Sequence, residues 1–553
     1  MEEESYGACN KDKESNQGHL VNVDMFLEHI GEFGKMQIIL QIMFCIMMLP
    51  ATYQTLLLTF AANNPDWKCT GLSAECNNTN TIFHSSHDFY EQRCKFKNRS
   101  SWEFVQPKKF SIVTEWDLIC EKNSLSYLAN SALFLGWAVG ALVLSAIADR
   151  FGRKSVLFPS LGTVILCGFI SAFVHNFWLF FVLRLITGFA QGGVGLSIYV
   201  LATELVGPNF RALSGTIVWF AFTAALCLIG LKAYLVPDWR MLEIIVSAPY
   251  AFVIVFWKCV PESVRWLRVN DKVDEAEVIL RKVAKTNGKI QPTVKLSTAE
   301  KDTAHGTYAD LFRPASTCRD TLVQSFAWFV NGMVYYGVSL ASDNLGGDMY
   351  RDFVLTSLVE LPANILVIYL GNKIGRKPTT IWSMFIGALS CGAVAFIPNI
   401  ASNSAYMGLR ITLGMLGKLC ITVSFNELYV WSVELNPTIV RSQGMGLLQV
   451  ISRIGAATAP WVAQWLRLYG DYLPFLLMGG LTMVATFLCF TLKETKGKET
   501  AEVFTRKSKP AIEEVTMVKM DHSRVEPNVE VMAIRREDEI VLSNKDVTEP
   551  IMG

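Results

Sequence analysis

Long apolar runs recur along the chain and are separated by polar connections. The first run long enough to cross a lipid bilayer covers about residues 35–62, after a polar N-terminal stretch, residues 1–34. A helix that crosses a bilayer needs about 20 mainly apolar residues. By this criterion we predict further spans near 125–147, 155–175, 177–199, 212–234, 241–259, 320–342, 351–371, 379–399, 405–430, 442–466 and 471–492.

The order of these spans divides the chain into two halves. A charged segment, residues 260–319, separates about six predicted helices in 35–259 from about six more in 320–492. The pattern therefore predicts an all-α membrane protein with about twelve transmembrane helices in two six-helix halves. The charged segment has a helical period over 273–280, which predicts short amphipathic helices. The tail, residues 493–553, is charged and irregular, and we expect it to be disordered.

The composition agrees with a membrane protein and excludes other classes. Hydrophobic residues make up 51% of the 553 residues and charged residues only 18%, whereas about a quarter of a soluble protein is charged. These values exclude a disordered, collagen-like or nucleic-acid-binding chain. The 50 basic and 49 acidic residues leave a net charge of +1, so we expect the lipid bilayer, and no nucleic acid, as a partner.

One polar segment, residues 63–124, is longer than the other connections and has a different chemistry. It contains two acceptor sequences for N-glycosylation, which begin at Asn77 and Asn98. It also contains four cysteines, Cys69, Cys76, Cys94 and Cys120. Disulfides and N-linked glycans form outside the cytosol, so we predict that this loop lies on the outer side of the membrane. Four cysteines allow three pairings, and the spacing does not choose among them.

Basic residues indicate which side of the membrane is cytosolic. Short cytosolic connections carry an excess of Lys and Arg. The connections 149–154 and 373–377 are strongly basic, whereas those around Val236 and Asn399 are not. Both termini and segment 260–319 are therefore predicted to be cytosolic, and no cleavable signal pattern precedes the first span.

Short motifs recur in the two halves at a nearly constant offset. Gly152-Arg153-Lys154 recurs as Gly375-Arg376-Lys377, an offset of 375 − 152 = 223. Arg184 recurs as Arg410, an offset of 226, and the pair Glu204 and Arg211 recurs as Glu434 and Arg441, an offset of 230. Each match joins a helix to its counterpart six helices later. The halves are therefore parallel repeats, which is typical of a transporter with its binding site at the repeat interface.

Three further motifs resemble solute carrier family 22, the organic ion transporters of the major facilitator superfamily. They are residues 30–34 (IGEFG), 114–120 (TEWDLIC) and 261–267 (PESVRWL). The resemblance covers residue 21 to about residue 500 and implies the major facilitator fold, alternating access and a plasma-membrane location. It also implies disulfides between Cys69 and Cys94 and between Cys76 and Cys120. Departures from the family pattern, Val264, Asn436 and Lys493, concern the cytosolic gate.

Charged residues gather at the cytosolic ends of the predicted helices in both halves. One interpretation is a latch, in which ion pairs worth about 0 to 1 kcal/mol each together favour the outward-open state and still permit conversion. The alternative is a solvated rim that follows the usual distribution of positive charge. The proposed gating residues are Asp149, Arg153, Glu204, Arg211, Glu262, Arg265, Arg376, Glu434, Arg441 and Glu494.

Arg453 is the sharpest candidate for substrate binding. It lies about eleven residues into span 442–466, about 16 Å from the cytosolic end, and a charge at that depth is costly and usually faces a cavity. Members of the resembled family that carry organic anions or zwitterions often have Arg here, whereas cation carriers have Asp. The alternative is a structural Arg that pairs with a carboxylate of the bundle.

Two acidic residues within spans are further candidates for substrate binding. Glu360 precedes Pro362, which frees a backbone carbonyl and marks a place where a helix bends, and family members commonly have an acid here. Glu427 is not typical of the family. Three roles stay open for it: it neutralises Arg453, contacts a substrate ammonium group, or reaches cytosolic water.

Aromatic and amide side chains complete the predicted pocket. Aromatic faces bind flat organic ions by stacking and ammonium groups by cation–π attraction. The alternative is ordinary packing against lipid or neighbouring helices. The candidates are Trp219, Phe222, Trp328, Tyr335, Tyr336, Phe425 and Asn426.

The sequence favours a polyspecific secondary transporter of small organic anions or zwitterions. An organic cation transporter of the same family is the alternative, because acids and aromatics accompany Arg453. A receptor that does not transport is a weaker alternative, because the deep charges and the gate residues are both present. Phosphate-binding, metal-ligating and redox motifs of enzymes are lacking, so we expect no enzyme, cofactor or bound metal, and a driving force from solute gradients. The sequence does not choose a co-transported or exchanged ion.

Overall fold

The computed structural model describes most of the chain between residues 20 and 497 and two short strands near the C-terminus. The described residues are 20–21, 23–70, 76, 81–84, 90–96, 99–289, 295–296, 307–313, 315–341, 348–398, 404–437, 440–497, 532–536 and 539–543. The chain divides into two compact units, Met1–Phe504 and Thr505–Gly553.

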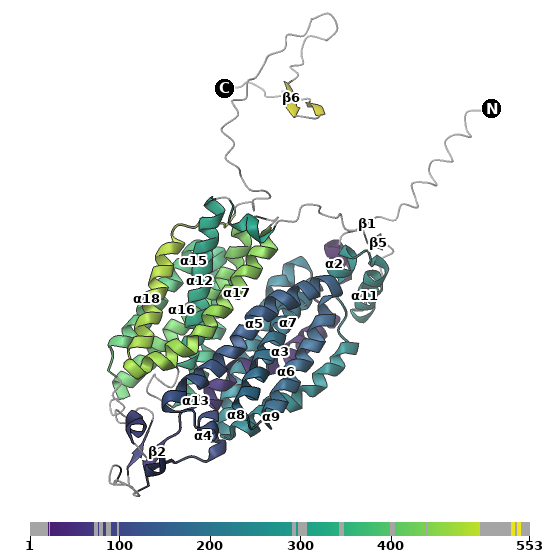
Figure 1. The fold of residues 1–553 in the computed structure, drawn as a ribbon. Helices are drawn as coiled ribbons and strands as arrows, with labels where there is room; N and C mark the ends of the chain where they lie inside the picture. The colour runs from purple at the N-terminus through teal and green to yellow at the C-terminus, as the bar shows by residue number, and fades with distance from the viewer. Residues whose placement is uncertain are drawn as a thin grey trace, which may run out of the picture. The chain divides into compact units, whose positions relative to one another are not determined.

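The N-terminal half is a bundle of long helices (Figure 1). Helices α5 and α7 pack closely because glycines allow their backbones to meet: a Cβ added at Gly140 would lie 1.9 Å from Phe189 O, and one at Gly192 would lie 2.3 Å from Ala141 N. The helices are α3 (Lys35–Ala61), α5 (Asn123–Phe151), α6 (Arg153–Ser171), α7 (Phe177–Glu204), α8 (Arg211–Leu235) and α9 (Trp239–Ser247), which the 3₁₀ helix η6 (Ala248–Lys258) extends.

The C-terminal half repeats this arrangement. Its helices are α12 (Ala315–Leu340), α13 (Met349–Leu358), α14 (Glu360–Lys373), α15 (Arg376–Phe396), α16 (Ser404–Leu435), α17 (Arg441–Pro460) with the π-helical turn η10 (Trp461–Trp465) and η11 (Leu466–Tyr469), and α18 (Leu473–Cys489). The predicted span 351–371 is interrupted between α13 and α14. Pro362 explains the interruption, because a proline has no N–H to donate to the carbonyl of Leu358.

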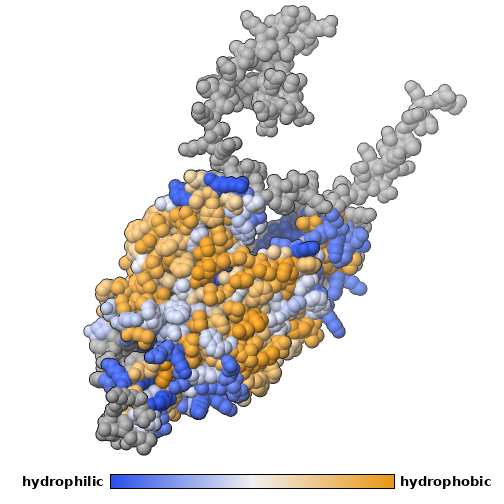
Figure 2. Space-filling model, in the orientation of Figure 1, coloured by the Kyte–Doolittle hydropathy of each residue, from blue (hydrophilic) through white to orange (hydrophobic). Residues whose placement is uncertain are grey.

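The predicted spans agree with these helices to within a few residues at most ends. Within the described ranges, nine helices are long and apolar enough to cross a membrane by length and composition. Large apolar side chains such as Phe173, Trp382 and Phe487 are exposed on their outer faces. Figure 2 shows hydrophobic surface around the middle of the bundle and hydrophilic surface gathered toward its ends. This distribution fits a bundle surrounded by lipid.

Short helices and strands lie at both ends of the bundle. We call the end with the α5–α6 and α14–α15 junctions the motif end. It also carries α2 (Val23–Ile30), η5 (Pro208–Phe210), α10 (Val264–Val269), α11 (Val273–Thr286), η7 (Tyr308–Leu311) and the parallel pair β1 (Leu20–Val21) and β5 (Lys295–Leu296). The helices α10 and α11 confirm the short helices predicted in segment 260–319.

We call the opposite end, which holds the cysteine-rich loop, the disulfide end. A three-stranded antiparallel sheet in the order β3-β2-β4 organises the loop, with Trp67 of β2 between Phe83 and Phe104. The elements are β2 (Trp67–Cys69), β3 (Ile82–Phe83), η1 (Tyr90–Lys95), η2 (Arg99–Ser101), β4 (Trp102–Phe104), η3 (Lys108–Phe110), α4 (Ile112–Trp116) and η4 (Cys120–Lys122).

The disulfide pairing differs from the expected one. Cys69 pairs with Cys76 and Cys94 pairs with Cys120, with Cα–Cα distances of 5.4 and 5.5 Å. The pairing implied by family resemblance, Cys69–Cys94 and Cys76–Cys120, is therefore wrong. The reason is local geometry, because a disulfide forms only between cysteines whose Cα atoms lie about 4.4 to 6.8 Å apart, and the fold brings Cys69 of β2 to Cys76 and Cys94 of η1 to Cys120 of η4 at such distances. The glycosylation candidates Asn77 and Asn98 lie outside the described residues.

The tail contains an element that the sequence analysis does not predict. Strands β6 (Met532–Arg536) and β7 (Glu539–Ser543) form an antiparallel hairpin, with Arg536 opposite Glu539 at the turn. The start of the predicted tail, residues 493–497, is not disordered, because Glu494 accepts the backbone N–H groups of Arg376 and Lys377 and holds this segment against α15. Apart from this segment and the hairpin, the residues assigned to the tail lie outside the described ranges.

Candidate substrate site between the two halves

The two halves meet closely at the disulfide end. The Ser131 hydroxyl on α5 donates to the Ala457 carbonyl on α17 at 2.6 Å, and the Trp461 indole N–H donates to Ser131 at 3.0 Å. Nearby, the rings of Phe60 on α3 and Tyr350 on α13 stack with centroids 5.6 Å apart. These contacts close the interface on this side of the centre.

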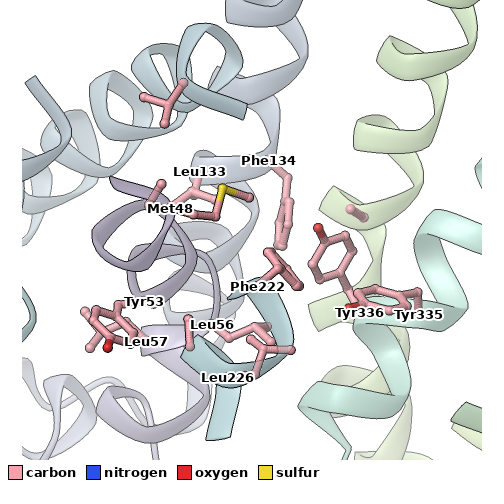
Figure 3. Packing of buried hydrophobic residues seen from close by; sticks show 14 of the residues in the cluster. Met48, Tyr53, Leu56, Leu57, Leu133, Phe134, Phe222, Leu226, Tyr335 and Tyr336 are labelled. Atoms are coloured by element: carbon pink, nitrogen blue, oxygen red, sulfur yellow. The ribbon is translucent and has the colours of Figure 1, made fainter. Parts of the chain in front are cut away.

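A cluster of aromatic rings lines the interface near mid-depth. Figure 3 shows Phe134 and Phe222 of the N-terminal half turned toward Tyr336 of the C-terminal half, and Phe134 and Tyr336 have ring centroids 4.6 Å apart. From Tyr336 the contacts continue within the C-terminal half and return to Trp219 on α8. The sequence of neighbouring rings is Tyr336, Tyr335, Phe425, Trp328, Tyr429 and Trp219. All five predicted aromatic residues of α8 and α12 belong to this cluster or contact it.

Arg453 on α17 enters this cluster from one side. Its guanidinium carbon lies 3.8 Å from the centroid of the Trp137 ring, and its Nη1 donates to the Tyr336 hydroxyl at 3.2 Å. The residue is 7% exposed. Within the described part of the chain, no carboxylate lies within ion-pair distance of it. The structural alternative, an Arg neutralised by a bundle carboxylate, therefore has no support in this conformation.

Glu360 on α14 reaches the same cluster from the other side, and it is paired. Lys418 Nζ on α16 lies 3.2 Å from Glu360 Oε1. The Tyr335 hydroxyl donates to Oε1 at 2.6 Å, and the Thr223 hydroxyl of the N-terminal half donates to Oε2 at 3.1 Å. Three donors and a full positive charge thus satisfy this carboxylate.

Lys418 is the functional residue that the sequence analysis missed. Its ammonium group also donates to the Tyr335 carbonyl at 3.0 Å and to the Ser339 hydroxyl at 2.7 Å, and it lies 3.3 Å from the Tyr335 ring centroid. The signal was present, because a single lysine within the apolar run 405–430 is costly unless it is paired.

The remaining candidates on α16 lie nearer the motif end. Phe425 belongs to the aromatic cluster, and the Asn426 amide donates to Asn364 on α14 at 2.6 Å. Glu427 is buried beside Arg376, with Arg376 Nε 3.8 Å from its Oε1. The structure thus pairs Glu427 with a gating residue and not with Arg453.

In the N-terminal half, the predicted gating residues form one network at the motif end. Arg153 pairs with Asp149 at 2.9 Å, and Glu262 accepts the backbone N–H groups of Arg153 and Lys154 at 2.9 and 3.1 Å. Glu204 accepts from the Ser263 hydroxyl. This arrangement fixes the start of α6 against the segment that precedes α10.

Asp24 on α2 holds the other two arginines of this network, and the sequence analysis did not single it out. It pairs with Arg265 at 2.5 Å and with Arg211 at the start of α8. A second link joins the same segments, because the Gly207 N–H donates to the Glu32 carbonyl at 3.0 Å. The polar N-terminal segment is therefore part of the folded motif end.

The C-terminal half has a matching network. Arg376 pairs with Glu434 at 3.3 Å, and Glu494 accepts the backbone N–H groups of Arg376 and Lys377 at 3.1 and 3.0 Å. Partial burial opposes ionisation of Glu494, but the backbone donors of Lys496, Arg376 and Lys377 outweigh it and hold its pKa below the usual range. The stability these donors provide is present above the usual Glu pKa and is lost as the pH falls through the lower folded value.

Arg441 is the exception within this second network, because its Nε and Nη2 are buried without a hydrogen-bond partner among the described residues. Among the described residues, the gating residues pair as Arg153 with Asp149 and Arg211 and Arg265 with Asp24 in one network, and as Arg376 with Glu427 and Glu434 in the other. In this conformation the predicted latch is therefore two separate networks, and no ion pair between described residues joins one network to the other.

Known proteins are similar to this chain in sequence and in fold. Residues 74–505 match the family described as "Sugar (and other) transporter". The chain is 30% identical to the organic cation transporter protein of Drosophila melanogaster, over 88% of this chain and 96% of the relative. It is 34% identical to organic cation/carnitine transporter 2 of Homo sapiens, over 72% of each chain.

Two further similarities complete the comparison. Solute carrier family 22 member 6-A of Xenopus laevis is 30% identical, over 85% of this chain and 91% of the relative. The inward-open xylose transporter XylE of E. coli superposes with a TM-score of 0.59 at 15% identity and covers 84% of this chain and 98% of its own. That structural likeness identifies the fold, which is the major facilitator fold.

Proposed function

Because the chain belongs to the sugar (and other) transporter family and, within it, to solute carrier family 22, we propose that it moves small organic anions or zwitterions by alternating access. The protein is a multi-pass membrane transporter of organic ions, not an enzyme.

The balance of charge in the aromatic cluster carries the proposal. Glu360 is neutralised by Lys418 and accepts from two hydroxyl groups, whereas Arg453 has an aromatic ring and one hydroxyl but no carboxylate among the residues that the structure describes. Within these residues, the charge of the site that lacks a partner of opposite sign is therefore the Arg453 guanidinium. A guanidinium offers a planar pair of donors that matches a carboxylate or sulfate, so a substrate anion supplies the missing partner.

The aromatic rings suit the remainder of such a substrate. Trp328, Tyr335 and Phe425 offer ring faces and edges close to the charged groups, which stack on flat organic groups and attract alkylammonium groups. A zwitterion with a carboxylate on Arg453 and an ammonium group over these rings uses both features. Polyspecificity follows, because rings and one guanidinium constrain shape only loosely.

An organic cation is the second candidate, favoured by the names of the Drosophila relative and of the human cation/carnitine relative. A cation without a carboxylate has to compete with Lys418 for Glu360 and to sit near an unneutralised Arg453. Both requirements cost electrostatic free energy at a site with an effective dielectric of about 20, so we rank this candidate second.

We further propose that the motif end faces the cytosol and the disulfide end faces outward, in the plasma membrane. Basic residues at the α5–α6 and α14–α15 junctions support this orientation, as do the two disulfides at the opposite end. Both termini are then cytosolic, and Asn77 and Asn98 carry glycans. The halves touch at the disulfide end, and no ion pair between described residues joins them at the motif end, which corresponds to a state open to the cytosol.

The test is uptake of labelled anions, cations and zwitterions, with and without sodium, by cells that express the chain. L-carnitine and an aromatic monocarboxylate serve as the zwitterion and anion. Arg453→Asp reverses the local charge by two units and is expected to abolish anion and zwitterion uptake while it spares cation uptake. Arg453→Lys is expected to retain part of the uptake, because the charge stays and the paired donors are lost.

Tyr336→Phe is the matched control for Arg453, because it removes the hydroxyl that accepts from the guanidinium and leaves the charge. We expect a smaller loss of affinity than for Arg453→Ala. The proposal fails if an Arg453→Ala protein at the cell surface carries its anionic substrate with unchanged affinity and rate.

A further inference from the structure

A buried carboxylate at the motif end of the C-terminal half has no role in the proposed substrate site. Glu427 is 1% exposed, and its Oε1 has no hydrogen-bond donor among the described residues. It packs against α14, where a Cβ added at Gly371 would lie 2.7 Å from Glu427 Oε2. A buried acceptor without a donor costs about 1 to 3 kcal/mol, and a buried charge without a close partner costs more.

The N-terminal half places its corresponding carboxylate in water. There Arg153 pairs with Asp149, whose side chain is 69% exposed. At the same repeat offset, 376 − 153 = 372 − 149 = 223, the C-terminal half has Arg376 and Asn372. The Asn372 amide oxygen accepts from Arg376 Nη1 at 3.3 Å but carries no charge.

Glu427 restores the charge that Asn372 lacks, but from the interior. At the offset that relates Glu434 to Glu204, which is the nearer repeat match on the same helices, the counterpart of Glu427 is residue 427 − 230 = 197. This residue is Ser197, which is buried. The other two acids correspond between the halves, with Glu434 matching Glu204 and Glu494 matching Glu262. Arg153 and Arg376 are therefore each accompanied by three acids, and at Arg376 the acid that takes the place of the exposed Asp149 is Glu427, whose side chain is 2% exposed.

The charges around Glu427 come from three elements. Arg376 faces it from α15, Glu434 lies two turns along its own helix α16, and Glu494 acts on it from the segment after α18. On the α14 side, the residue in contact with Glu427 is Gly371, which has no charged side chain. The ammonium group of Lys373, on the same helix, donates instead to the Tyr369 hydroxyl at 2.8 Å. Three carboxylates thus share one guanidinium.

The position of Arg376 consequently depends on the charge of Glu427. A charged Glu427 draws the guanidinium inward, toward the α14–α16 contact. A neutral Glu427 leaves Arg376 to Glu434 and Asn372 at the surface. The side chains of Arg376 and Glu434 are 19% and 26% exposed, so they connect the buried carboxylate to water at the motif end.

We propose that Glu427 is a proton-binding site, through which the proton concentration on the motif side of the membrane controls the ion pairs of Arg376 at the motif end of the C-terminal half. One proton from water adds to a carboxylate oxygen of Glu427, and the cluster changes by one unit of charge. Release of the same proton restores the ion pair with Arg376. Nothing is consumed, so the site modulates or couples transport without a further reactant.

The first test detects the proton directly and does not depend on transport. Infrared difference spectra of the purified full chain, recorded as the pH is changed between about 5 and about 8, report the carbonyl stretch of protonated carboxylic acids. We expect the titrating signal of the wild type to contain one component that is lost in Glu427→Gln. Glu243→Gln is the matched control, because Glu243 is an equally buried glutamate that accepts from Gln54 and Ser171; this variant is expected to keep the component that Glu427→Gln loses.

The second test rests on the proposed transport function and uses labelled L-carnitine, or the best substrate of the uptake panel, in proteoliposomes. The double variant Glu427→Ser, Asn372→Asp rebuilds the arrangement of the N-terminal half. We expect it to transport with a pH profile at least about threefold flatter than that of the wild type, like Glu427→Gln, while Glu243→Gln keeps the wild-type profile.

The two tests separate the two proposals. Absence of uptake for every substrate contradicts the transport proposal, and the infrared band is unaffected by that result. An infrared band and a pH profile that both persist unchanged in Glu427→Gln overturn the assignment of Glu427.

Discussion

Lys418 and Glu360 form a buried ion pair between α16 and α14, and such a pair is sensitive to the loss of one partner. Lys418→Met leaves Glu360 uncompensated, which we expect to lower the free energy of unfolding by about 3 to 5 kcal/mol. Lys418→Met with Glu360→Gln removes both charges and is expected to recover most of that loss. Thermal unfolding of the purified protein, followed by fluorescence, measures both effects.

Lys232→Met is the control for this comparison. Lys232 is a partly exposed lysine in a span; its ammonium donates to the Tyr250 hydroxyl at 2.9 Å and has no carboxylate partner among the described residues. Its removal is expected to cost far less. A double variant that is no more stable than Lys418→Met alone would show that the two charges do not compensate each other.

The candidate site could be predicted only in part from individual residues. Arg453 stood out because a guanidinium deep in a span demands an explanation, and the structure leaves it without a carboxylate. Lys418 and Asp24 were missed for different reasons. Lys418 is visible only as one charge in an apolar run, and Asp24 acts through tertiary contacts with Arg211 and Arg265, which no local pattern reveals.

At the scale of elements, α2 ties the start of α8 to α10 through the carboxylate of Asp24. If this link transmits motion at the motif end, Asp24→Asn and Arg211→Ala are each expected to slow turnover several-fold while substrate affinity stays nearly unchanged. The double variant is expected to be no slower than Asp24→Asn alone, because Arg211→Ala removes an ion pair that Asp24→Asn has already removed. Initial rates and competition binding in the same membranes distinguish turnover from affinity, and additive losses would argue against a shared link.

The cysteine-rich loop depends on its two disulfides because its sheet has only three short strands. A cross-link stabilises by reducing the entropy of the unfolded loop, and the effect grows with loop length. Cys94–Cys120 spans 26 residues and Cys69–Cys76 spans 7, so loss of the former is expected to cost about 1 kcal/mol more. Two double variants check this ranking by their surface expression: Cys94→Ser with Cys120→Ser, and Cys69→Ser with Cys76→Ser. Peptide mapping of the intact bonds in the wild type checks the pairing.

Secondary structure was predictable where the physics is local. Apolar runs of span length predicted the helices, and Pro362 predicted the place where α13 gives way to α14. The disulfide pairing was not predictable in this way, because it depends on how β2 and η1 place Cys69 and Cys94 in space. The hairpin β6–β7 in the tail was also not predicted, since its flanking sequence is charged and irregular.

At the scale of the whole molecule, contacts between the two halves run from the disulfide end to the aromatic cluster, where Trp219 lies near Tyr429. Ser131, Ala457 and Trp461 join α5 to α17, and Phe60 stacks on Tyr350 across α3 and α13. Among the described residues, no ion pair of the gating residues crosses between the halves at the motif end. Alternating access then requires the disulfide-end contacts to separate while the motif ends approach.

A cross-link between the halves at the disulfide end is therefore expected to stop transport. Phe60→Cys with Tyr350→Cys replaces two rings whose centroids are 5.6 Å apart, and a short bismaleimide then bridges the halves in the state described here. We expect labelled substrate uptake to fall to background in proportion to the cross-linked fraction. The matched control is Tyr53→Cys with Tyr250→Cys, whose ring centroids are 5.5 Å apart but which both lie in the N-terminal half. Bridging that pair is expected to leave transport largely intact, because the halves move as units. Unimpaired transport by a Phe60→Cys, Tyr350→Cys protein that is fully cross-linked would contradict the requirement that this contact opens.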